Sequence, residues 1–465
     1  FLIQKWIKDV PPFRKNYWKD SWNCYALSIR IVNWIDIISE NSFLLKSINK
    51  ETLDLINRSI EYQVDFLVNN LELDIRGNHL IKNIRCVFRA CSYFKGLKVI
   101  KWFESINSYF LEELNKQFLS DGMHYELSPS YHNLVAEDLI CIRRSFNSFY
   151  LDLNSYLDHE IKHKLDDVIK KMYFIILKLT HPDGLPSLFS DGGLNACKIP
   201  SVLTKKIEET LQISNHIELS NKNIWSLNNS GFYGIRSLDN YFITKCGDFG
   251  ADSLPAHGQS DSLSFEWSVK GARIIVDQGV FTYHPGFERD FSRSTKAHNT
   301  VTLNNLDQSD CWSSFKVGRR ARTKVTKFEK FEDGFFLKAF HNGYQHLKGK
   351  PLVFREMFIK PKNILFNDYV DGFFKHSVKS RILFSPKVIL KKINNKNSKK
   401  YECLLKILKE DENCEDLSFI LQSDCDFLIC NTFWYPNFGV KIPTKRIEFN
   451  LGFSPCKSSW SIINI

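Results

Sequence analysis

Apolar residues recur with helical spacing through the first half of the chain, up to about Ser214. Short breakers such as Ser120-Asp121-Gly122 and His181-Pro182-Asp183-Gly184 interrupt this spacing. The segments with the clearest periodicity are Tyr25–Ile38, Leu53–Val68, Asn83–Phe94, Val99–Phe118, Leu134–Phe149 and Ile161–Leu179. We therefore predict an all-α half built from antiparallel helical hairpins, of which an incomplete α/α toroid is one form.

After Gly231 the pattern changes to short β-branched and aromatic runs separated by Gly, Asp and Asn. Such runs are Tyr241–Lys245, Leu263–Val269, Ala272–Val276, Thr300–Leu303 and Phe335–Phe340. Many strands without alternating helices favour an antiparallel β-sandwich over a parallel α/β sheet. We predict an α+β multidomain chain, with an α/α toroid domain over residues 1–220 and a β-sandwich domain over residues 221–465.

Length and composition are those of a large globular protein. The 465 residues suffice for two cores, and 43% hydrophobic with 25% charged residues excludes a disordered chain. The 14% aromatic content fits either a Phe-rich core, which we favour, or a cleft that stacks against sugars. A net charge of +11 favours polyanionic partners. The basic run Lys392–Lys400 is typical of a solvated hairpin tip, so we expect no nucleic-acid partner.

The cysteines and the N-terminus bear on location. Twelve cysteines are dispersed without a C-x-x-C pair, which favours a reduced compartment such as the cytoplasm, with the periplasm as the alternative. No stretch reaches the roughly 18 apolar residues of a membrane span. The first residues, FLIQKWIKDV, show no signal-peptide pattern, so we expect a trimmed or mature form.

Chemistry-bearing residues gather where helices are predicted to begin. Gly77-Asn78-His79 precedes a helix expected from about Leu80, and Ser128–His132 precedes one expected from about Asn133. Backbone N–H groups at such positions favour anions. Asn78 and Ser128 could equally be simple N-caps.

The β half adds two polar segments that carry histidine, Pro255–Asp261 and Arg293–Thr300, each ending at a predicted strand. Loops of this kind are usually exposed and a lone histidine in them is usually inert. Two such loops together nevertheless indicate a site. No G-x-S-x-G, Walker, G-x-G-x-x-G or H-E-x-x-H motif is present.

Five segments together carry a family resemblance: GNHL, YELSPSYH, HPDG with SLFSDGG, HGQSDSLSFEW and RSTKAHNTV. In this order they resemble the motifs of heparinase II/III-like proteins, a group that includes heparin and heparan sulfate lyases and alginate lyases of bacteria. The resemblance covers nearly the whole chain. It implies a toroid followed by a sandwich, and a carbon–oxygen lyase that cleaves a uronate-containing glycan by β-elimination.

The same resemblance implies roles for individual residues. Asn78 and His79 match the positions that neutralise the uronate carboxylate, Tyr131 matches the catalytic base and acid, and His257 matches the histidine of the cleft. We expect these residues to meet across one interdomain cleft, with Tyr131 close enough to His79 or His257 for a bound uronate to fit between them and with Arg293 able to reach the cleft wall. The further residues expected to bind substrate are Glu126, His132 and Arg293.

One position departs from the resemblance. Related members resemble H-x-H-x-D, whose second histidine joins an aspartate and a later histidine in holding a structural metal. Here that position is Gln259, while Asp277 and His298 match the other two ligands. An amide oxygen is a poor zinc ligand, so we expect no required cofactor and at most a weak structural metal ion. Without a metal, the three residues would form a hydrogen-bonded network.

Other functions stay open. A non-catalytic glycan-binding or scaffold protein of surface-polysaccharide metabolism could retain the fold. A hydrolase or uronate epimerase is a third reading; a hydrolase needs paired carboxylates, for which Glu126 and Asp191 are the best loop candidates. The sequence does not specify the uronic acid or the oligomeric state.

Overall fold

The computed structural model describes residues 1–13, 15–16, 19–40, 48–149, 159–213, 223–393, 400–407 and 417–465. The chain divides into two compact units that interleave along the sequence. The first unit comprises Phe1–Phe118, Leu134–Tyr173 and Lys205–Ile213. The second comprises Leu119–Asn133, Phe174–Thr204 and Ser214–Ile465. Two pieces of the helical half therefore belong to the unit that contains the strands.

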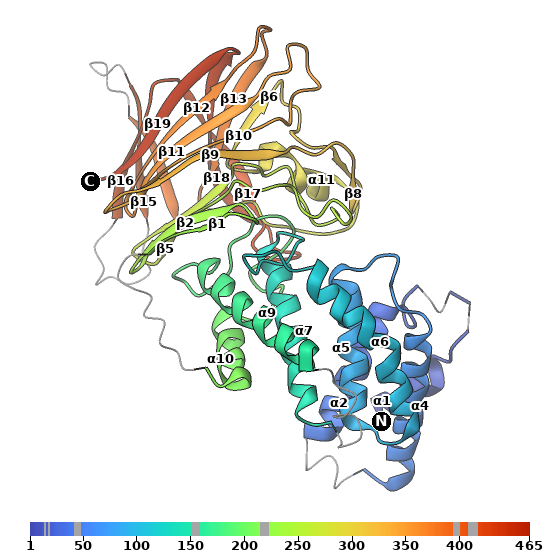
Figure 1. Cartoon of the computed structure of the whole chain (residues 1–465). Coiled ribbons are helices and arrows are strands. Elements are labelled where there is room, and N and C mark those ends of the chain that lie inside the picture. The colour runs from blue at the N-terminus through green and yellow to red at the C-terminus, as the bar shows by residue number, and fades with distance from the viewer. Residues whose placement is uncertain are drawn as a thin grey trace. The chain divides into compact units, whose positions relative to one another are not determined.

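The helical half consists of successive helices joined by loops (Figure 1). Those in the described residues are α1 (Leu2–Asp9), α2 (Cys24–Glu40), α4 (Lys50–Val68), α5 (Gly77–Tyr93), α6 (Leu97–Lys116), α7 (Pro129–Phe146), α9 (His159–Lys178) and α10 (Pro200–Leu211). Within the first unit, the Phe88 ring of α5 packs edge-on against Phe103 and Phe110 of α6 and Phe146 of α7. The apolar faces predicted from periodicity thus meet in one core.

The second half consists of strands. They are β1 (Asn223–Leu227), β2 (Phe232–Ser237), β3 (Asn240–Lys245), β4 (Phe265–Val269), β5 (Ala272–Ile275), β6 (Val301–Leu303), β7 (Cys311–Trp312), β8 (Lys316–Val317), β9 (Thr323–Lys330), β10 (Phe335–His341), β11 (Val353–Lys360), β12 (Asn363–Val370), β13 (Ser377–Leu383), β14 (Val388–Ile393), β15 (Tyr401–Ile407), β16 (Leu417–Ser423), β17 (Phe427–Trp434), β18 (Ile442–Phe453) and β19 (Cys456–Asn464). A short helix, α11 (Phe287–Arg293), and a 3-10 turn at Thr295–Ala297 lie between β5 and β6.

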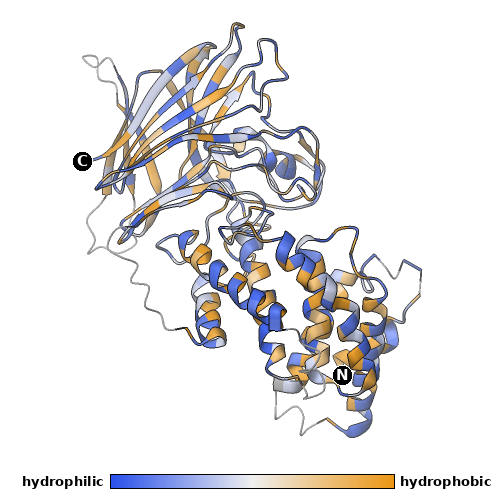
Figure 2. Cartoon of the chain, in the orientation of Figure 1, coloured by the Kyte–Doolittle hydropathy of each residue, from blue (hydrophilic) through white to orange (hydrophobic). Residues whose placement is uncertain are grey.

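These strands form a five-stranded sheet in the order β1-β2-β3-β4-β5, an eight-stranded sheet, β14-β15-β16-β19-β12-β11-β10-β9, a four-stranded sheet, β17-β18-β13-β6, and the pair β7-β8. Along β11 and β12 buried residues alternate with more exposed ones. Hydrophobic and hydrophilic residues are mixed along both the helices and the strands (Figure 2).

The three larger sheets share one core. The Trp460 ring of β19 stacks on Phe366 of β12, with ring centroids 4.4 Å apart. It also stacks on Phe265 of the five-stranded sheet at 5.9 Å and on Phe449 of the four-stranded sheet at 5.6 Å. One aromatic side chain thereby joins all three sheets, and truncating a ring of this kind to alanine typically costs about 3–5 kcal/mol.

The predicted fold class is confirmed. Helices occupy the first half, and every strand pair in the described residues is antiparallel. Two helix starts differ from the prediction: α5 begins at Gly77 rather than near Leu80, and α7 begins at Pro129 rather than near Asn133. The 220/221 boundary and residues 394–399 of the predicted hairpin tip lie outside the described residues. Among the helices that are described, none has the length and apolar character needed to cross a membrane.

Candidate active site

The first turn of α7 presents Tyr131. Ser128 precedes the helix, and its Oγ accepts a hydrogen bond from the backbone N–H of Tyr131 at 3.2 Å, so Ser128 is the N-cap that the sequence left as an alternative. The same hydroxyl donates to the backbone carbonyl of Asp191 at 2.6 Å. Ser128 therefore fixes the start of α7 and joins it to the segment that carries Asp191.

Tyr131 and His257 are in direct contact. Their rings stack with centroids 3.7 Å apart and an angle of 24° between the planes. The Tyr131 hydroxyl also lies 3.1 Å from the hydroxyl of Tyr283. The stack leaves no space for a uronate between the two rings, contrary to one form of the prediction. Tyr131 itself is only partly buried.

A buried carboxylate lies behind His257. Asp191 Oδ2 is 3.1 Å from His257 Nδ1, and the backbone N–H of Asp191 donates to the carbonyl of His257 at 2.9 Å. Arg289 binds the carboxylate with both terminal nitrogens, at 2.5 Å to Oδ1 and 2.8 Å to Oδ2. Gln259 Nε2 donates to Oδ1 at 2.8 Å. Asp191 and Arg289 are both fully buried, so this ion pair has no competition from water.

The charges in this cluster set its protonation. Burial opposes ionisation of Asp191, but Arg289 and His257 outweigh it and lower the pKa of the carboxyl to about 2. Burial raises the pKa of the Tyr283 phenol well above its usual range, and the charge of Asp191 adds to this effect. Asp191 is therefore an anion, and Tyr283 keeps its proton, at neutral pH.

Two residues with left-handed backbone support the site. Leu127 has φ 54° and Ser190 has φ 60°, a conformation that usually costs non-glycine residues about 1 kcal/mol or more. They precede Ser128 and Asp191 respectively, and Ser190 Oγ donates to the Leu127 carbonyl at 3.3 Å. The buried Lys245 anchors Ser190 Oγ at 2.7 Å and pairs with Asp261. These hydrogen bonds hold the segment that contains Leu127 beside the segment that contains Ser190.

Glu126 and His132, expected to bind substrate, lie in the interior next to the stacked pair. Both are almost completely buried, and Glu126 Oε2 is 3.8 Å from His257 Nε2. His132 Nδ1 accepts a hydrogen bond from the backbone N–H of His124 at 3.2 Å. Burial lowers the pKa of His124 to about 4 against the opposing effect of Glu126. Glu126 therefore contacts the stacked pair from the interior, on the His257 side.

Arg293 differs from its expected position. It is 1% exposed, and its guanidinium donates to the backbone carbonyls of Lys316 at 3.1 Å and Gly258 at 3.4 Å. The expectation that it reaches the wall of a cleft is therefore corrected, because its donors hold the loop around Gly258 together. Arg289, one turn earlier in α11, is the arginine that contacts the site.

Asn78 and His79 belong to the first compact unit, in the first turn of α5. His79 Nδ1 lies 2.9 Å from Glu72 Oε1, and its ring is 4.5 Å from that of Tyr25. Asn78 is mostly buried. Tyr131 and His257 belong to the second unit, and the predicted convergence of the four residues stays a prediction.

The three residues expected at a metal site do not act together. Asp277 accepts hydrogen bonds from His298 Nδ1 and Ser264 Oγ, at 2.7 and 2.6 Å, whereas Gln259 turns to Asp191. Gln259 Oε1 and His298 Nε2 are buried without hydrogen-bond partners. Over the described ranges, no three His, Cys, Asp or Glu side chains gather as a metal site. One imidazole and one carboxylate are too few for zinc, so the residues do not fit that ion.

Sequence reasoning missed Tyr283 and Arg289 and assigned Asp191 only to a hydrolase pair. Arg289 stands 98 positions after Asp191, and nothing in the periodicity of FTYHPGFERD connects the two. The spacing of Arg289 and Arg293 on one helical face was the available signal.

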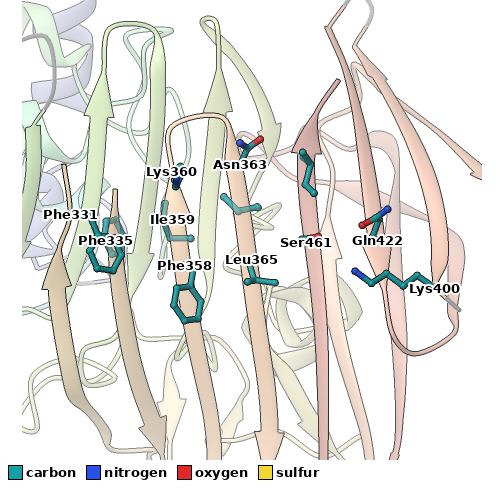
Figure 3. Close-up of a pocket in the computed structure, with 12 residues that line it drawn as sticks. Phe331, Phe335, Phe358, Ile359, Lys360, Asn363, Leu365, Lys400, Gln422 and Ser461 are labelled. Atoms are coloured by element: carbon teal, nitrogen blue, oxygen red, sulfur yellow. The ribbon is translucent and has the colours of Figure 1, made fainter. Parts of the chain in front are cut away.

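A prominent cavity lies elsewhere. A pocket of about 490 Å³ opens on the eight-stranded sheet (Figure 3). Its walls include Phe331, Phe358 and Leu365, with Lys360 and Gln422 among its polar residues. Its lining contains none of the candidate site residues described above.

Comparison with known families matches both halves. The model of the heparinase II/III N-terminus matches residues 1–216, and that of the heparinase II/III-like C-terminal region matches residues 220–458. A heparin-sulfate lyase of Bacteroides stercoris is 28% identical over 284 residues, which are 54% of this chain and 40% of the relative. One of Bacteroides thetaiotaomicron is 22% identical over 76% of this chain and 53% of the relative.

Solved structures share the fold. A crystal structure of heparinase III aligns over 100% of this chain and 72% of its own, with a TM-score of 0.78 and 17% identity. The heparan sulfate lyase HepC from Pedobacter heparinus aligns over 100% of this chain and 71% of its own, with a TM-score of 0.66 and 19% identity. The chain spans about half the length, or less, of the curated relatives it matches.

Proposed function

This chain belongs to the heparinase II/III-like family, and from that premise we propose that it is a polysaccharide lyase that cleaves an acidic, uronate-containing glycan by β-elimination. The observation that carries the proposal is the stack of Tyr131 on His257, held from behind by the buried anion Asp191. A phenol and an imidazole in contact are suited to moving a proton at one sugar carbon.

In the proposed reaction Tyr131, acting as a phenolate, takes the proton from C5 of the uronate. The electrons of that C–H bond form the C4–C5 double bond, and the bond from C4 to the glycosidic oxygen breaks. The leaving oxygen then receives a proton from Tyr131. Charge that develops on the uronate carboxylate requires nearby donors, and we assign this task to Asn78 and His79. His257, whose Nδ1 faces Asp191, offers its Nε2 as a proton acceptor.

The charge state of Asp191 argues against a hydrolase. A hydrolase needs one carboxyl that holds a proton as the acid and another that acts as base or nucleophile. The pKa of Asp191 is about 2, and Arg289, Gln259 and His257 occupy its oxygens. Asp191 is therefore neither a proton donor nor a free nucleophile, and its predicted pairing with Glu126 loses its chemical basis.

Sulfated glycosaminoglycans are the first substrates to test, since the curated relatives are heparin-sulfate lyases. The net charge of +11 suits polyanions. The two arginines in the described site are committed to Asp191 and to backbone carbonyls, so sulfate recognition falls to other basic residues. No metal takes part in the proposed chemistry.

The test is a panel of acidic glycans that includes heparan sulfate, heparin, chondroitin sulfate and alginate. Ultraviolet absorbance of the C4–C5 double bond reports elimination directly. We expect absorbance to rise with at least one of these glycans. Binding without any rise would favour the alternative function, a non-catalytic glycan-binding or scaffold protein.

A further inference from the structure

We propose that Asp191, held by Arg289 and Gln259, is a positioning residue that fixes the ring and the tautomer of His257. This inference rests on the proposed function, because it concerns the same site. Asp191 acts through the imidazole of His257, which stacks on Tyr131. Neither Asp191 nor Arg289 was assigned such a role from the sequence.

The contacts between the two residues are mutual. The side chain of Asp191 faces His257 Nδ1 at 3.1 Å, and its backbone N–H donates to the His257 carbonyl at 2.9 Å. His257 is thus bound to Asp191 through both its ring and its main chain. The Tyr131 ring, 3.7 Å away, fixes the plane of the imidazole on one face.

An ionised carboxylate can only accept hydrogen bonds, so the proton on Nδ1 must point toward Asp191. Nε2 then becomes the nitrogen that is left for other partners, and Glu126 Oε2 lies 3.8 Å from it. A histidine that is free to change tautomer would present the wrong nitrogen part of the time. The carboxylate removes that freedom.

Arg289 and Gln259 keep the carboxylate in place. Arg289 reaches Asp191 from a position where its Nε and Nη2 also donate to the carbonyl of Ser314, at 2.8 and 2.6 Å. Gln259 donates to Oδ1 through Nε2. Rotating the amide would bring Gln259 Oε1 against the carboxylate, so Asp191 fixes the amide as well. Gln259 and Arg289 together therefore hold the Asp191 carboxylate. Gln259 does so from the position at which the family resemblance predicted a metal ligand.

The test combines turnover with nitrogen NMR of the histidine rings. Asp191→Asn should lower kcat by about tenfold or more while KM changes by no more than about threefold, because loss of the correct tautomer affects the chemical step. In the His257→Ala background, Asp191→Asn should cause no further loss. The His257 signal, assigned by its absence from His257→Ala, should show a protonated Nδ1 in the wild type and a changed tautomer in Asp191→Asn.

Matched variants separate positioning from stability. Asp183 is held by Arg273 in a similar fork, with contacts of 2.6 and 3.2 Å, and Asp183→Asn should lower the melting temperature without changing kcat. Gln259→Met, a milder change, should lower kcat less than Asp191→Asn does, and it keeps the test open if Asp191→Asn does not fold.

Two results would overturn the inference: an unchanged His257 tautomer in both Asp191→Asn and Gln259→Met, or a kcat equal to that of the wild type in the folded variants. If the wild type itself yields no unsaturated product, the proposed function fails instead. The NMR comparison would still decide whether Asp191 fixes His257.

Discussion

The phenol oxygen of Tyr131 is the atom on which the proposed elimination depends most. Tyr131→Phe keeps the ring that stacks on His257 but removes the group that moves the proton. We expect kcat to fall by about 10²–10⁴-fold while glycan binding and the melting temperature change little. Initial rates of absorbance increase, together with glycan titrations, measure both effects.

Tyr93→Phe is the matched control, because it removes a hydroxyl that bonds another side chain, that of Asn57 at 3.1 Å, within the first unit. It should leave kcat unchanged. A Tyr131→Phe protein that kept most of its turnover would remove tyrosine from the mechanism.

Gln259 gives the second test on a single side chain. The Gln259 amide donates a hydrogen bond to Asp191, so only Asp277 and His298 match the metal ligands of related proteins. Purified protein should therefore contain clearly less than one zinc per chain. Chelators should then barely change the melting temperature. Metal analysis by mass spectrometry provides the measurement. One tightly held zinc per chain, lost together with stability on chelation, would contradict this prediction.

The role and position of a single residue could be predicted from the sequence only where the residues around it in the chain form a recognisable motif. The motifs around Tyr131 and His257 were recognisable as local strings. The buried state of residues 257–261 was not, because polar loops are usually exposed, and here the polar groups pair with distant residues such as Asp191. Arg293 was misplaced for the same reason: its partners are backbone carbonyls, which leave no pattern in the side chains.

Among the secondary-structure elements, α7 matters most, because its first turn carries Tyr131. Ser128→Ala removes the cap bond to the Tyr131 N–H and the bond to the Asp191 carbonyl. We expect a loss of about 1–2 kcal/mol in the free energy of unfolding and a lower kcat, since Tyr131 and Asp191 lose a shared anchor. Thermal unfolding and initial rates measure the two effects.

Asn49→Ala is the control for this element. Asn49 caps α4 in the same way, accepting from the Thr52 N–H at 2.8 Å, and belongs to the first unit. It should cost about 1 kcal/mol of stability with no change in kcat. Equal effects of both variants on kcat would show that the cap of α7 has no special role in the reaction.

The helices and strands themselves were predictable where their periodicity was strong. The expected starts of α5 and α7 lay about one turn too late, because Asn78 and Tyr131 are polar residues in first turns and do not extend the apolar pattern. The helix α11 was not predicted, since its seven residues are too few to show a period. It nevertheless supplies Arg289.

The stability of the whole protein should depend on pH through buried histidines. Burial lowers the pKa of His341 to about 3, and Arg355 adds to this effect; burial also lowers that of His124 to about 4. In the unfolded chain both would titrate near 6.5. Their contribution is therefore fully present above about pH 6.5 and is lost as the pH falls toward the folded values, by up to about 1.4 kcal/mol per pH unit for each histidine.

Denaturant unfolding at pH 7 and pH 5 measures this slope. His341→Gln should make the decline shallower, whereas His163→Gln should not, because His163 is largely exposed. Identical slopes in the wild type and His341→Gln would contradict the assignment of a neutral, buried His341.

The two-part organisation of the whole chain was predictable, because the change from helical to strand periodicity covers hundreds of residues. The interleaving of the compact units was not. Leu119–Asn133 and Phe174–Thr204 lie among helical segments in the sequence but belong to the unit that contains the strands. This assignment depends on long-range packing, such as that of Phe189 on Phe232, with ring centroids 5.7 Å apart.

The central claim is that this protein cleaves its glycan by elimination, and the most direct test is the fate of water. The wild-type protein is incubated, in water enriched in the heavy oxygen isotope, with the glycan that gives the largest absorbance change, and the fragments are weighed by mass spectrometry. Elimination predicts two fragments whose masses, before any oxygen exchange at the reducing end, sum to that of the uncleaved glycan, one of them carrying an unsaturated uronate. Fragments whose masses sum to that of the glycan plus one water, with the heavy oxygen taken up in the cleavage and without an unsaturated uronate, would contradict it and show hydrolysis.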